Sequence, residues 1–245
     1  MAIHLLVGAA GGIGSALARQ LTARGDTVLL AGRTDQPLAA LAAELGQPWT
    51  ALDARDFEAV DGAVGDLVDE HGQIDGATNC AGSVVLKPAH LTTAADYADV
   101  IATNLTTAFA VVRAAAPKMR RTGGSIALVS TAAAATGIAN HEAVAAAKGG
   151  IEALVRSAAA TYGARGVRVN AVAPGLVETP QTAAMLANQT QADASRAMHV
   201  LGRFGTPDDI ASALAWLLDP ATSWVTGQVL GVDGGLGQVR TRAKA

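Results

Sequence analysis

The sequence has few aromatic residues, a single cysteine and no excess of basic charge. Phe, Trp and Tyr make up 3% of the 245 residues, although 50% are hydrophobic. The core must therefore rely on Ala, Val, Leu and Ile, which suits helices packed closely on a parallel sheet. The lone Cys80 excludes an intrachain disulfide, and its place after an apolar strand favours a small buried side chain over a nucleophile. The five histidines lack metal-ligand spacing, so we predict no metal site.

Charge and hydropathy exclude further classes of protein. The net charge of −3 comes from scattered residues and provides no footprint for nucleic acid or an anionic membrane. No apolar leader opens the chain, no uninterrupted apolar stretch could span a bilayer, and no Pro- or Ser-rich linker divides it. We expect one domain over residues 1–245, located in the cytoplasm, that binds a small molecule.

A glycine-rich turn over residues 5–14 separates an apolar strand from a helix. The turn includes Gly8, and Gly12 and Gly14 stand on either side of Ile13 where the helix begins. Glycines allow positive φ and close approach of an anion, while the helix N-terminus attracts phosphate. Such a turn can also be a simple tight connection, but a second apolar strand at residues 27–31 completes a βαβ unit. The pattern favours a dinucleotide pyrophosphate as the ligand.

Arg33 follows the second strand, where a dinucleotide fold meets the adenosine ribose. An aspartate there would hydrogen-bond both ribose hydroxyls of NAD, whereas an arginine can pair with a 2′-phosphate. We therefore predict that NADP(H) is preferred and that NAD(H) is possible. The alternative is that Arg33 is merely a solvated loop residue.

The rest of the chain alternates strands and helices, as in a doubly wound α/β sheet. Strands are predicted at residues 49–52, 74–78, 125–130, 166–173 and 228–232, and helices at 36–45, 57–71, 92–121, 140–163 and 207–218. The long helical region is interrupted near Thr103 and Asn104. Residues 180–206 are polar, Ala-rich and weakly periodic, which predicts a mobile lid, and residues 236–245 are predicted to be a tail.

Taken in this order, the motifs resemble those of the short-chain dehydrogenase/reductase family over the chain to about Gly235. The resemblance implies a Rossmann-type, seven-stranded parallel sheet of order 3-2-1-4-5-6-7 with helices on both faces. It also implies that the coenzyme contacts are Gly8, Gly12, Ile13, Gly14, Arg33, Asp53, Ala54, Asn79, Ala81, Gly82, Lys148, Pro174, Gly175, Val177 and Thr179.

The same resemblance implies an incomplete catalytic set. The family uses a serine to polarise a carbonyl, a tyrosine to transfer the proton and a lysine four residues later. Lys148 is present, but Val144 stands at the tyrosine position and cannot exchange a proton. The six-residue spacing of the enoyl-reductase branch falls on Glu142 and fails as well. Thr131, with Ser130 beside it, occupies the serine position.

Other residues can support the chemistry. Asn104 fits the family's relay motif, whereas neither Tyr97 nor Tyr162 can replace the missing tyrosine. His141 would share a helix stripe with Val144 if the helix began at residue 140, although a helix N-terminus makes an imidazole a better base than acid. A capping or surface role for His141 is the alternative.

Two functions therefore remain open at this point. One is an NADP(H)-dependent oxidoreductase acting on a small carbonyl, alcohol or imine-type substrate, with Thr131 or Ser130 orienting an oxygen. The other is a catalytically silent NADP(H)-binding sensor or inactive subunit. The family resemblance implies a homotetramer or homodimer whose interface uses the helices at residues 104–119 and 143–162.

Overall fold

Seven parallel strands form one sheet of order β3-β2-β1-β4-β5-β6-β7 in the computed structural model, which describes residues 1–240. The strands are β1 (Ile3–Val7), β2 (Thr27–Gly32), β3 (Trp49–Ala51), β4 (Gly76–Asn79), β5 (Gly124–Val129), β6 (Val167–Pro174) and β7 (Val229–Val232). The predicted strand order is confirmed. All residues of β1 and β6 are buried, as expected where helices cover both faces of a parallel sheet.

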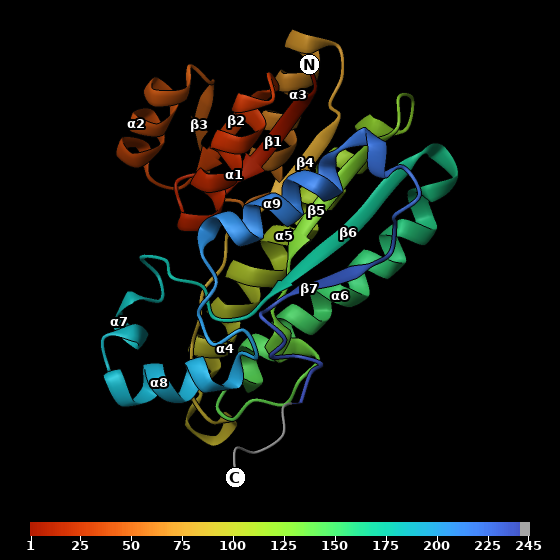
Figure 1. Ribbon diagram of the computed structural model, residues 1–245. Helices are drawn as coiled ribbons and strands as arrows, with labels where there is room; N and C mark the ends of the chain where they lie inside the picture. The colour runs from red at the N-terminus through yellow and green to blue at the C-terminus, as the bar shows by residue number, and fades with distance from the viewer. Residues whose placement is uncertain (241–245) are drawn as a thin grey trace.

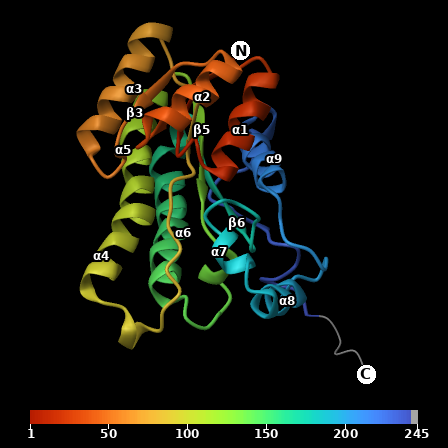
Figure 2. The same cartoon turned by 90° about the vertical axis from the view of Figure 1, so that its left-hand side faces the viewer.

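Helices cover the two faces in separate layers. They are α1 (Gly12–Ala23), α2 (Asp35–Leu45), α3 (Phe57–His71), α4 (Ala94–Ile101), α5 (Thr107–Met119), α6 (Glu142–Tyr162), α7 (Ala183–Leu186), α8 (Gln189–Met198) and α9 (Pro207–Leu218). Leu17 of α1, Leu38 of α2 and Leu214 of α9 belong to one buried cluster. The other cluster joins the sheet to α3, α5 and α6. Figures 1 and 2 show the sheet between these layers.

The core is built from small and branched aliphatic side chains. Within residues 1–240, Phe204 is the only aromatic side chain among the buried hydrophobic residues. Helix α5 buries a run of alanines, which lets its backbone approach the sheet closely. This packing agrees with the expectation from composition.

Helix α6 begins two residues later than predicted. Asn140 has a φ of 64°, the only positive φ of a non-glycine residue in the described part of the chain. A left-handed residue cannot belong to the helix, so α6 starts at Glu142, and His141 precedes its first turn. The predicted start at residue 140 was wrong.

Helices α4 and α5 are continuous through a π-helical turn, Ala102–Thr106. By length and composition the stretch Ala94–Met119 could cross a membrane, contrary to the expectation from hydropathy, but most of its apolar window is buried inside the protein. It is therefore placed as a core helix of this fold. Asn104, in the π turn, is fully buried, so the predicted interruption of the helix carries an internal polar side chain.

The segment predicted as a lid contains two helices. Both views place α7 and α8 beyond the carboxyl end of β6 (Figures 1 and 2). The buried His199 ties α8 to the segment after β6, because its Nδ1 donates to the Ser195 carbonyl (2.8 Å) and its Nε2 accepts from the Leu176 amide (3.1 Å).

The predicted tail starts as part of the fold. Leu236 is buried, and the Gly237 amide donates to the Asp233 carboxylate at 2.8 Å. The prediction for residues 241–245 lies outside the described residues.

Candidate functional site

The glycine turn between β1 and α1 has the shape that its sequence predicts. Gly8 has a φ of 77°, and a Cβ there would come within 2.5 Å of the Ala81 amide nitrogen. A Cβ on Gly14 would lie 2.2 Å from the Gly8 carbonyl oxygen. Neither contact is possible for a larger residue, so these two glycines are required for the turn itself.

The N-terminus of α1 suits an anionic ligand. Its N-cap, Gly11, makes no side-chain capping bond, and the first turn holds no acidic residue. The backbone N–H groups of this turn thus remain available for phosphate. Gly12 faces Thr179, whose Cγ2 would lie 2.9 Å from a Cβ at that position. The residues present therefore fit a dinucleotide pyrophosphate.

A cavity of about 920 Å³ opens at the carboxyl ends of the strands, beside this turn. All five predicted catalytic residues line it, namely Asn104, Ser130, Thr131, His141 and Lys148. It is also lined by the predicted coenzyme contacts Gly12, Ile13, Gly14, Ala81, Gly82, Pro174, Gly175, Val177 and Thr179. The fold thus brings most of the predicted site residues to one crevice, as expected at a topological switch point.

Five predicted coenzyme contacts are not among the lining residues. They are Gly8, Arg33, Asp53, Ala54 and Asn79. Gly8 underlies the turn, and the Asn79 amide is occupied inside the fold, since it donates to Thr107 Oγ1 (2.9 Å) and accepts from the Ala81 amide (3.1 Å). Asn79 therefore positions the wall of the crevice.

Two arginines, Arg33 and Arg55, lie near Asp53 at the end of the site where an adenosine would bind. The three side chains together carry a net positive charge. Arg55 grips the Asp53 carboxylate with Nε and Nη2 at 2.5–3.0 Å. This hydrogen bonding from Arg55 lowers the pKa of Asp53, and the charge of Arg33 lowers it further. Exposed Arg33 makes no ion pair or hydrogen bond with residues 1–240, which leaves its guanidinium available for a ligand. Arg55 belongs to no recognisable motif, so its hydrogen bonds to the Asp53 carboxylate were not predicted from the sequence.

Lys148 is a buried cation that has no carboxylate partner among residues 1–240. Its Nζ donates to the Val129 carbonyl at 2.8 Å and lies close to Gly82 and Asn104. Burial lowers the pKa of Lys148 to about 8. Burial also raises the pKa of the Cys80 thiol to about 12, so the thiol stays protonated. One donor of the ammonium is engaged, and the others face the cavity that Lys148 lines.

Of the two candidate hydroxyls, the Thr131 hydroxyl is the one left free to donate. Ser130 Oγ donates to Glu152 Oε1 on α6 at 2.8 Å, and Ser130 is buried. Thr131 Oγ1 accepts a bond from the Ala133 amide at 3.3 Å, which leaves its O–H without an acceptor in the described chain. Glu152 was not predicted as a contributor; its signal is its position one turn after Lys148 on the same helix face.

Val144 lies one helical turn before Lys148, and it both lines the cavity and packs on Val100. Neither tyrosine of the chain lines this cavity. His141 does, and its Nδ1 lies 2.8 Å from the Ala139 carbonyl. Because a carbonyl only accepts, Nδ1 carries the ring proton in the neutral form and Nε2 is left as an acceptor.

Two further contacts of the cavity wall were not predicted. Gln181, from the segment after β6, donates its amide to the Gly82 carbonyl at 3.1 Å, which joins that segment to the loop after β4. The Asn104 amide binds Ser83 through that residue's backbone and hydroxyl. In each pair the two residues lie far apart in the sequence, so no local pattern could have indicated the contact.

A parallel sheet with a glycine turn at its central crevice defines an α/β protein of the dinucleotide-binding class. Residues 8–237 match a family model described as enoyl-(acyl carrier protein) reductase. The chain is 35% identical over 237 residues to the 3-oxoacyl-(acyl-carrier-protein) reductase FabG of Vibrio harveyi, covering 96% of both chains. It is 37% identical over 239 residues to a cis-4-hydroxycyclohexanecarboxylate dehydrogenase of Sinomonas cyclohexanicum, covering 95% of both.

Solved structures agree with the sequence comparisons. A short-chain type dehydrogenase/reductase from Mycobacterium ulcerans matches with a TM-score of 0.94 at 30% identity, over 98% of this chain and 90% of that one. A variant of actinorhodin polyketide ketoreductase with NADPH matches with a TM-score of 0.91 at 27% identity, over 97% and 98%. The chain belongs to the short-chain dehydrogenase/reductase family, whose members among these relatives are oxidoreductases.

Proposed function

We propose that this protein is an NADP(H)-dependent oxidoreductase that transfers hydride to or from a small carbonyl, alcohol or imine-type substrate without the family's catalytic tyrosine. The observation that carries the proposal is the cavity in which Thr131 and Lys148 are kept while Val144 replaces the proton donor. The coenzyme supplies the hydride when it is bound. The protein's own task is to hold both reactants and to manage one proton.

Each polar residue of the cavity has a separate task in this proposal. Thr131 donates its free hydroxyl to the substrate oxygen and fixes its orientation. Lys148 holds the nicotinamide ribose with the donors that Val129 leaves free, and Asn104 keeps the adjoining loop in place through Ser83. Ser130 positions α6 through Glu152 and does not touch the substrate.

The proton is exchanged with water or with His141. Nε2 of His141 is the unprotonated nitrogen of the neutral ring, which suits it to accept a proton in the direction of alcohol oxidation. By microscopic reversibility the same group returns the proton in the reductive direction. If His141 is that group, His141→Ala should lower kcat/KM for oxidation and for reduction by the same factor, and if water is, the change should leave both values unaltered.

The coenzyme preference rests on Arg33. It is exposed at the end of β2, free of ion pairs with the described residues, and near Asp53. A 2′-phosphate fits these surroundings better than a bare ribose does, because its charge would meet two arginines. NAD(H) binding remains possible, because the glycine turn would hold the pyrophosphate that both coenzymes share.

A turnover screen tests the proposal. Purified protein, first shown to bind NADPH by fluorescence titration, is incubated with NADPH and a panel of ketones, aldehydes and imines. Coenzyme oxidation above the rate without protein supports the enzyme. Tight NADPH binding with no turnover on the panel supports the second candidate, a silent NADP(H)-binding sensor or inactive subunit, which the aliphatic Val144 favours.

The proposal also includes the protein's organisation. The chain acts as one dinucleotide-binding domain in which residues 180–206 open and close over the substrate, held in the closed state by the Gln181 bond to Gly82. It works in the cytoplasm as a homotetramer or homodimer through α5 and α6. Family membership and the exposed Phe109 on α5 support the assembly.

A further inference from the structure

The half of the cavity away from the glycine turn has an uncharged wall. Its apolar part includes Ile138, Val144, Met185, Met198 and Leu236, which come from the loop before α6, from α6 itself, from α7 and α8, and from the end of the fold. Methionine side chains are flexible and polarizable, so this wall can adapt to apolar groups of different shape.

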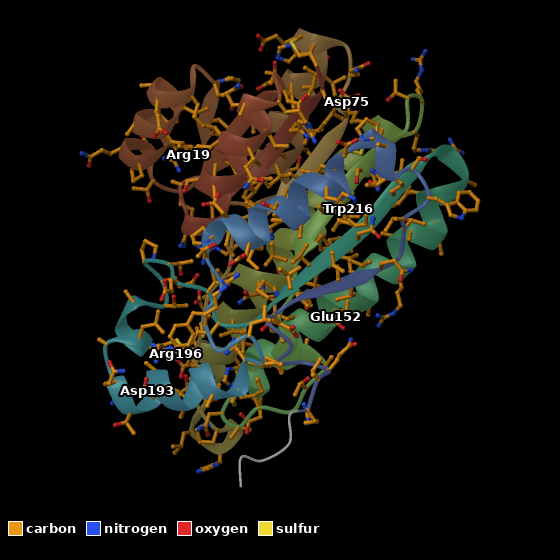
Figure 3. The ribbon with its side chains drawn as sticks, in the orientation of Figure 1. Arg19, Asp75, Glu152, Asp193, Arg196 and Trp216 are labelled. Carbon is orange, nitrogen blue, oxygen red and sulfur yellow. The ribbon has the colours of Figure 1, made fainter. Side chains whose placement is uncertain are left out.

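The polar groups of the same wall are neutral. Asn140, Gln191 and Ser195 contribute amides and a hydroxyl. The charged side chains of α8, Asp193 and Arg196, are not among the lining residues and pair with each other (labelled in Figure 3). Arg196 also stacks its guanidinium over the Phe204 ring at 4.8 Å. Helix α8 thus presents no charge to the cavity.

In the described part of the chain, His141 is the titratable side chain of this wall, since it stands between the lining residues Asn140 and Val144, and the wall contains no lysine, arginine or carboxylate. Within residues 1–240, the lining includes no Asp, Glu or Arg, and its titratable side chains are Cys80, His141 and Lys148. Cys80 stays protonated, and Lys148 lies at the coenzyme end against Val129 and Gly82. A charged group placed between α7, α8 and Leu236 would therefore give up part of its water without meeting an opposite charge, which is unfavourable.

We propose that this part of the cavity selects substrates whose body is uncharged and mostly apolar, with Gln191 and Ser195 as neutral hydrogen-bonding partners for at most one polar substituent. Sugar phosphates, carboxylates and quaternary amines are excluded as the distal group. The inference rests on the proposed function for the identity of the reacting group, but it concerns binding and does not require turnover.

Matched ligands that differ mainly in charge test it in the complex with NADPH. One pair is oxocyclohexanecarboxylate and its methyl ester, and the other is dimethylcyclohexanone and its isosteric quaternary piperidinium ketone. Dissociation constants are measured by calorimetry under one set of conditions for all four ligands. The neutral member of each pair should bind at least about tenfold more tightly. Equal or tighter binding of a charged member, or no binding of either neutral ketone, overturns the inference.

A designed charge provides the second arm. Gln191→Arg places a cation in the wall and should tighten oxocyclohexanecarboxylate binding by about tenfold. Thr190→Arg is the matched control, because Thr190 is exposed on the same helix but does not line the cavity. An equal gain in both variants would mean long-range attraction and would refute selection by the wall. Failure of the parent protein to bind NADPH would instead overturn the proposed function.

Discussion

A tyrosine in place of Val144 should create or raise carbonyl reductase activity. The new hydroxyl would start from a position one helical turn before Lys148, on the face of α6 that already lines the cavity. Thr131 and Lys148 would then act with a proton donor between them. A positioned general acid contributes about 10²–10⁴-fold to the rate, which sets the expected gain in kcat/KM for the parent's best ketone.

The substitution also has a calculable cost. Val144 is 4% exposed and packs against Val100 and Ala147. If the ring remained in that cluster, overpacking would cost about 1–3 kcal/mol, whereas a ring turned into the cavity costs less. For a chain of this length, 1 kcal/mol lowers Tm by about 2–4 °C. A small shift in Tm therefore reports that the ring entered the cavity.

Val144→Phe separates the hydroxyl from the bulk of the ring. NADPH oxidation is followed for the parent and both variants on one ketone panel, after NADPH binding and Tm have been measured for each. The reasoning predicts a gain for Val144→Tyr and none for Val144→Phe. It is refuted if both variants bind NADPH and melt alike and the tyrosine variant is no faster than the phenylalanine variant.

Three further outcomes are expected. Arg33→Asp should reverse the coenzyme preference in fluorescence titrations, with a loss for NADPH of about 1.5–3 kcal/mol as for other charge-assisted hydrogen bonds; a parent that binds NADPH and NADH equally would contradict this. Burial lowers the pKa of His4, so the fold favours its neutral ring and should lose stability as pH falls below the ordinary histidine range. Calorimetric Tm values should therefore fall more steeply with acid for the parent than for His4→Gln, and parallel curves would exclude His4 as the cause. Sedimentation at micromolar concentration should give a closed homotetramer or homodimer, and a monomer would disprove the assembly.

The sheet and the crevice could be predicted because they depend on local patterns. Strand order follows from the alternation of apolar strands and helices together with the family motifs, and the glycine turn is required by contacts such as that of Gly14 with Gly8. Helix α9 was also predictable, because Thr206 and Asp209 form its capping box.

The features that could not be predicted depend either on contacts between residues far apart in the sequence or on backbone conformations that the sequence allows but does not require. Asparagine can adopt the left-handed conformation but seldom must, so the start of α6 at Glu142, after the left-handed Asn140, had no decisive signal. The orientation of Ser130 toward Glu152 depends on packing between β5 and α6. Helix α8 was missed although Asn188 caps it, because most of its residues are polar or alanine and its apolar stripe is short.

The π turn at Ala102–Thr106 accommodates one extra residue between two helical ends that pack against different partners. Each residue of an α-helix advances by about 100°, and a π turn contains one residue more than an α turn. Val100 before the turn meets α6, and Val111 after it meets the sheet. Deleting a single residue here would convert the π turn into an α turn of the same rotation, so Val100 and Val111 would keep their facing and only the turn that holds Asn104 would change. A one-residue deletion in this segment should therefore displace Asn104 from its contacts with Ser83 while the packing of the two helical ends is kept.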